Sequence, residues 1–135
     1  MNTIVSFELA KLLKDAGFDI PIQHTVNNKS RVYNTVTGKL SEYVVTNSIK
    51  NWNDSKYKEL CSAPIIADVV MWLYEKHGIW LSVEQNTYEN KFDYLITKRN
   101  LNSWFVLDNN QRTLTSPTEA YEAAIEYCLT EIIKL

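Results

Sequence analysis

The chain has 135 residues, of which 45% are hydrophobic and 22% charged, and its formal net charge is −2. This length and composition are those of one globular domain of about 100–150 residues, and they exclude a disordered or fibrous chain. The small charge excludes a strongly basic surface for nucleic acid or an anionic membrane. Residues 1–61 carry 8 basic against 6 acidic residues, and residues 62–135 carry 6 against 10.

The two cysteines, Cys61 and Cys128, have no CxxC spacing and no companion histidine, so we expect neither a zinc site nor a cofactor. Their spacing alone leaves a disulfide open. The first residues lack the basic region and apolar core of a signal peptide, and no run approaches the roughly 20 apolar residues of a membrane span. We therefore expect a cytoplasmic chain without membrane contact and with both thiols free.

The first predicted element is a helix over residues 6–16, with Gly17 and Phe18 as a C-cap and its hydrophobic partner. Beyond Pro21 the pattern weakens. Residues 22–26 and 31–36 are expected to pair as a hairpin across residues 27–30, and residues 40–46 are expected to add a third strand. The polar residues 47–60 predict a mobile loop, in which Trp52 is unexpected.

The stretch from residue 62 to residue 84 predicts a helix, a stop and a strand. Ser62 or Ala63 is the predicted N-cap with Pro64 in the first turn, and Gly78 is the predicted end of the helix. The apolar stripe of this helix comprises Ile65, Ile66, Val69, Val70, Trp72, Leu73 and His77. The two-residue period of a half-buried strand then follows, with Ile79, Leu81 and Val83 alternating with Trp80, Ser82 and Glu84.

Two more strands and a helix complete the chain. Residues 92–97 alternate as a strand, residues 99–102 predict a turn, residues 104–107 a returning strand and residues 108–111 another turn. The tetrapeptide from Ser116 to Glu119 is a capping box with proline at the first helical position. The inner stripe of this last helix comprises Tyr121, Ala124, Ile125, Cys128, Leu129 and Ile132.

The order of these elements predicts an α+β fold. An N-terminal helix and hairpin precede a helix, three antiparallel strands and a helix, with the helices packed on one face of the sheet. No repeat, low-complexity tract or linker appears, so residues 1–135 are expected to form a single domain.

Three segments carry a family resemblance: residues 7–19, residues 62–80 and residues 116–125. Together they cover roughly half of the chain, and they resemble short uncharacterised proteins encoded in bacterial prophages and mobile elements. No activity, ligand or catalytic residue is known for that group. The resemblance implies a phage-related origin and an accessory role.

Two chemical alternatives need weighing. Helix, three strands and helix is the topology of double-stranded-RNA-binding domains, but the start of the last helix carries Glu119, Glu122 and Glu126, which would repel phosphate. Nucleic acid is therefore not the expected partner. A nuclease site built from Asp68 and the run from Glu89 to Lys91 would need its carboxylates at adjoining strand ends, whereas Asp68 lies in the first turn of a helix.

Histidines and thiols have ordinary structural interpretations. We expect His77, in the last turn of the central helix, to be partly protonated and to interact with the exposed carbonyls there. His24 has no sequence-near partner for a relay. Cys128 lies on a buried stripe, while Cys61 precedes a helix start that can lower a thiol pKa. A small hydrolase would have to gather Asp93, Glu84 or His24 in a pocket.

The excess of aromatic residues, with 4 Trp, 8 Tyr and 4 Phe, is the most suggestive feature. Trp80 is expected to point away from the aliphatic face of its strand, and Tyr94 and Trp104 join it if the register allows. We predict a non-enzymatic protein that acts through a protein–protein surface, as a homodimer or with another protein. The candidate interaction residues are Trp52, Trp72, Trp80, Tyr94 and Trp104.

Overall fold

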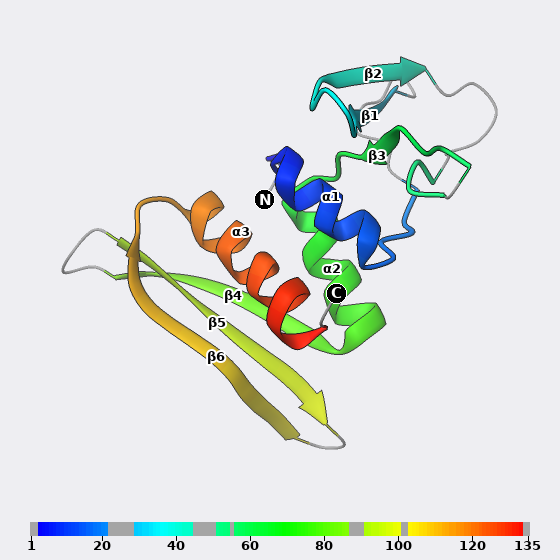
Figure 1. Cartoon of the computed structure of the whole chain (residues 1–135). Helices are drawn as coiled ribbons and strands as arrows, with labels where there is room; N and C mark the ends of the chain where they lie inside the picture. Colours follow the sequence, from blue (N-terminus) through cyan, green and yellow to red (C-terminus); the bar gives the residue numbers. More distant parts are fainter. Residues whose placement is uncertain are drawn as a thin grey trace. The chain divides into compact units, whose positions relative to one another are not determined.

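Figure 1 shows a computed structural model of the chain, which describes residues 3–21, 29–44, 51–54, 56–86, 91–100 and 103–133. The described residues form three α-helices and two three-stranded antiparallel sheets, so the predicted α+β class is confirmed. The chain divides into two compact units, essentially Ile4–Ile65 and Ile66–Lys134. Each unit is described by itself below, and the single domain stays a prediction.

The N-terminal unit begins with helix α1 (Phe7–Asp15), close to the predicted bounds. The Ser6 side chain accepts a hydrogen bond from the Leu9 N–H at 3.3 Å and caps the helix. At the other end Gly17 has a φ of 85°. The Phe18 N–H donates to the Leu13 carbonyl and the Gly17 N–H to the Lys14 carbonyl, which is the Schellman motif, and Phe18 is fully buried as its predicted partner.

The sheet of this unit has the strand order β2-β1-β3, formed by β1 (Lys29–Asn34), β2 (Leu40–Val44) and β3 (Leu60–Ser62). Strand β2 confirms most of the predicted strand over 40–46. Strand β3 was not predicted, and it pairs with β1 on the side opposite to β2. The predicted strand over 22–26 lies outside the described residues.

Where the structure describes the predicted loop over 47–60, the chain forms turns that are fixed by polar side chains. The Asn53 side chain donates to the Phe18 carbonyl and accepts from the Ser62 N–H, both at 2.8 Å. The Lys14 ammonium donates to the carbonyls of Tyr57 and Leu60 at 2.8 and 2.6 Å. These bonds tie the described turns to the end of α1 and to β3. The mobility expected of residues 47–60 stays a prediction.

The C-terminal unit begins with helix α2 (Ile66–His77), which ends, as predicted, before Gly78 with a φ of 66°. Its predicted N-cap was wrong. Ser62 pairs with Val32 in the sheet, the Ala63 N–H donates to the Arg31 carbonyl, and the Pro64 carbonyl accepts from the Val5 N–H. Because these backbone groups already have extended-chain partners, the helix starts only at Ile66.

The sheet of this unit has the strand order β4-β5-β6, formed by β4 (Ile79–Asn86), β5 (Lys91–Asn100) and β6 (Ser103–Leu114). Ile79 and Leu81 are buried and Trp80 is exposed, as the alternation predicts. The turn predicted over 108–111 was wrong, because β6 runs through it. Two shifts in the β5–β6 register absorb the extra residues, and the Tyr94 hydroxyl donates to the Asp108 carboxylate at 2.7 Å.

Helix α3 (Pro117–Tyr127) follows with Ser116 as N-cap, confirming the predicted start. Ser116 Oγ accepts from the Glu119 N–H at 3.1 Å, and the Glu119 carboxylate accepts from the N–H and hydroxyl of Thr115. These hydrogen bonds lower the pKa of Glu119. The helix continues as a π-helical turn, Cys128–Ile132.

Helices α2 and α3 cover the sheet of this unit from one side in Figure 1. Helix α3 packs against β4 and β5, and α2 packs against β4 and α3. The buried apolar side chains that these elements contribute are Ile66, Val69, Val70, Leu73, Ile79, Leu81, Ile96, Ala120, Ala124, Ile125, Cys128 and Leu129. The opposite side of the sheet carries the alternate residues of each strand.

Candidate interaction surface

Trp52 belongs to the interior of the N-terminal unit. Its side chain is only 7% exposed and packs with Val32 in a buried cluster. The ring stacks on Tyr43 at a centroid distance of 5.4 Å and contacts Tyr57 at 5.0 Å. The indole that seemed out of place in a polar stretch therefore fills the core beneath the described turns, so it offers no surface for a partner.

Trp72 and Tyr94 are interior residues as well, at 2% and 5% exposure. Trp72 lies on α2 and meets the His77 ring edge-on at 4.9 Å. Tyr94 lies on β5 and donates to Asp108 on β6. The position of Trp104 pairs with Arg99 in the β5–β6 register, and its side chain lies outside the described residues. Of the five aromatic candidates, Trp80 is the one whose described side chain is exposed.

The strand register explains this separation. Trp80 pairs with Thr97, and Val83 pairs with Tyr94. Because directly opposed residues share a face and neighbours along a strand alternate, Trp80 and Tyr94 point to opposite faces of the sheet. The expectation that they share one surface was wrong for Tyr94. Its face is the one that carries Leu81 and Ile96, both buried.

Trp80 is 41% exposed and shares its sheet face with further exposed residues. Across the outer face it is followed by Thr97 on β5 and by Val106 on β6, which is 64% exposed. On the helix side, Trp80 contacts Tyr74 at a centroid distance of 5.6 Å. Met71, one turn earlier on α2, is also exposed. We call Met71, Tyr74, Trp80, Thr97 and Val106 the Trp80 surface.

The surroundings of His77 differ from those that the sequence predicts. Burial, reinforced by the charges of Lys76 and Lys98, lowers its pKa. Its Nε2 is buried without a hydrogen-bond partner, and the ring packs against Trp72. Burial and the two lysine charges therefore favour the neutral imidazole over the partly protonated one that the sequence predicts.

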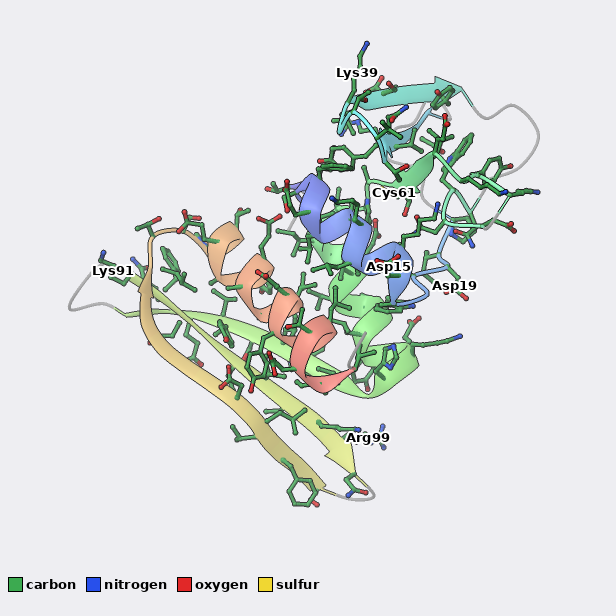
Figure 2. All side chains as sticks on the ribbon, in the orientation of Figure 1. Asp15, Asp19, Lys39, Cys61, Lys91 and Arg99 are labelled. Atoms are coloured by element: carbon green, nitrogen blue, oxygen red, sulfur yellow. The ribbon has the colours of Figure 1, made fainter. Side chains whose placement is uncertain are left out.

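Both thiols are buried and unpaired. Burial raises the pKa of Cys61, and the nearby Lys14 and Lys11 oppose this only in part. Cys61 lies within β3 rather than before a helix start, so the predicted fall of its pKa was wrong; Figure 2 marks this residue. Burial raises the pKa of Cys128 to about 12. Neither thiol has the exposed, electropositive surroundings of a reactive cysteine.

The acidic candidates are spread over the C-terminal unit. Asp68 lies in the first turn of α2, as predicted. Glu84 and Asp93 face each other across β4 and β5, so the register brings these two carboxylates together. Among the residues that the structure describes, no group of three or more His, Cys, Asp or Glu side chains is placed to hold a metal ion. His24 and Glu89 lie outside the described residues.

Comparisons of the chain with protein-family models, with curated proteins and with solved structures find no match. In the described part of the chain, no helix combines the length and apolar character needed to span a membrane. The Trp80 surface, built from one helix and three strands, is thus the candidate site that the geometry itself offers.

Proposed function

We propose that this chain is a non-enzymatic interaction protein that forms a homodimer through the Trp80 surface. The observation that carries the proposal is the exposed apolar set of Met71, Trp80 and Val106, joined by Tyr74 and Thr97. Contiguous exposed apolar residues mark interaction sites, and aromatic residues and methionine are enriched at protein interfaces. Helices α2 and α3 pack on one face of this sheet, and Trp80 and Val106 lie exposed on the other face, where the proposed partner would bind.

The chemistry of the described side chains supports binding rather than catalysis. The two thiols are buried with raised pKa values, and His77 packs against an indole with its pKa lowered. We also propose a cytoplasmic location, since unpaired thiols suit a reducing compartment. The resemblance of the chain to prophage-encoded proteins adds a phage-related accessory role to the proposal.

The test replaces Trp80 by glutamate and measures the molar mass by size exclusion with light scattering. The wild-type chain should have the mass of a dimer at about 100 µM, and Trp80→Glu that of a monomer, because a carboxylate would have to be desolvated in the interface. Val36→Glu is the matched control, since Val36 is 77% exposed in a turn of the other unit. A monomeric wild-type chain would refute the proposal.

A further inference from the structure

Within the described part of the chain, strand β4 is an edge strand that pairs with β5 on one side and with no strand on the other. The strand order β4-β5-β6 leaves β4 at one side of the sheet and β6 at the other (Figure 1). The Arg99 N–H donates to the Gly78 carbonyl at 2.9 Å, so the backbone carbonyl of Gly78 points toward β5. Because this direction alternates in an antiparallel pair, Ile79, Leu81 and Val83 direct their backbone groups away from β5.

The two edge strands of the sheet differ in the features that oppose pairing with another strand. Strand β6 is interrupted by two register shifts, and bulges of this kind protect natural edges from pairing. Strand β4 pairs with β5 through eight consecutive residues without a shift. It contains no proline and no lysine, and Glu84 is its sole charged residue. A long, regular edge strand with a single charged residue can pair with a strand of another chain, which extends the sheet.

The β4 sequence is also complementary to itself. In an antiparallel pair with a two-fold axis at Ser82, Leu81 of one copy lies beside Val83 of the other, twice, on the face that the helices cover. The two Glu84 carboxylates are then separated and each lies beside Trp80 of the other copy. An axis at Glu84 would instead oppose two like charges, which is unfavourable. The register about Ser82 avoids this repulsion and opposes apolar residues to one another.

We propose that two copies of this chain pair β4 to β4 about a two-fold axis at Ser82 and form a continuous six-stranded sheet. The partner is thus a second copy of the chain, joined by an isologous contact. This inference rests on the proposed function, because it specifies how the dimer forms. It also places Trp80 of both copies, together with Tyr74 that contacts it, at the new junction, whereas Val106 lies two strands away.

Disulfide trapping tests the register directly. Two Ser82 residues at the axis form a non-hydrogen-bonded pair with Cα atoms about 4.5 Å apart, a separation that a disulfide spans. Ser82→Cys should become a covalent dimer under mild oxidation. The native thiols are fully buried, so the wild-type chain should not. Ser103→Cys, exposed on β6, is the matched control. The two thiols introduced by this change are not held together in the proposed dimer and meet only by random collision, so this variant should cross-link at least about tenfold more slowly.

A second variant, Ser82→Lys, tests the same register without a disulfide, so the test does not depend on the folding of Ser82→Cys alone. Ser82→Lys opposes two ammonium groups across the axis and should raise the dimer dissociation constant about tenfold or more at low salt, with partial recovery at high salt. Ser103→Lys should leave the dimer intact, and circular dichroism should show every variant folded.

The outcomes separate this inference from the proposed function. A wild-type dimer that Ser82→Lys leaves intact, and in which Ser82→Cys cross-links no faster than Ser103→Cys, would overturn edge pairing. In that case the interaction function would stand, with the sheet faces stacked. A wild-type chain that is monomeric at about 100 µM would overturn both.

Discussion

At the scale of single residues, His77 shows how the surroundings decide a protonation state. Its place in the last turn of α2 would favour a positive charge, which interacts well with the free carbonyls of a helix end. The structure instead places the ring against Trp72 and near Lys76 and Lys98, and these surroundings lower its pKa. Desolvation and like charge outweigh the helix end.

This environment makes the stability of the chain depend on pH. With the folded pKa of His77 below its unfolded value near 6.5, the unfolded chain binds more protons as the pH falls through that value. The free energy of unfolding should therefore be lower at pH 5.5 than at pH 7.5. Urea titrations of His77→Gln should show a smaller loss over this interval. A variant whose loss equals that of the wild type would show that the neutral imidazole contributes nothing.

Residues also mark the limit of what the sequence can predict about the site. Trp80 was identified because strand alternation is local. The face of Tyr94 stays open from the sequence, because it depends on the register between two strands, and the observed register places it opposite to Trp80. Val106 and Met71 were missed, since one exposed apolar residue on a strand or helix has no distinctive signal in the sequence. Only the fold shows that they flank Trp80.

At the scale of elements, the start of α3 is the clearest case of a locally encoded boundary. Ser116 accepts from the Glu119 N–H, and Glu119 accepts in return from Thr115, one residue before the N-cap. Ser116→Ala should lower the free energy of unfolding by about 1 kcal/mol, the usual cost of a lost cap. Thr118→Ala, in the same first turn, is the control and should cost less. Denaturant unfolding followed by circular dichroism measures both, and equal losses would contradict the cap's role.

The elements that the sequence predicted well are those with such local signals. The caps of α1 and α3 and the glycine after α2 involve residues within one turn of each other. The elements that it missed depend on distant partners. Strand β3 exists because it pairs with β1, and β6 continues through Asp108 because bulges and the Tyr94 hydroxyl accommodate residues that otherwise favour a turn.

At the scale of the whole molecule, self-association should make stability depend on concentration. Any partner that binds only the folded chain stabilises it by mass action, and in the proposed dimer that partner is a second copy of the chain. The urea midpoint of the wild-type chain should rise between about 1 and 100 µM, while that of Trp80→Glu should stay constant. A wild-type midpoint that does not move over this range would argue against the dimer.

The aromatic cluster of Trp52, Tyr43 and Tyr57 has a practical consequence for following this molecule in solution. Trp52 is the sole tryptophan of the unit formed by Ile4–Ile65, and the other three belong to the second unit. Changing those three to phenylalanine would leave Trp52 as the single tryptophan, shielded from water and in contact with Tyr43 and Tyr57, which can transfer excitation energy to it. Its emission would then report the melting of one half of the chain independently of the other.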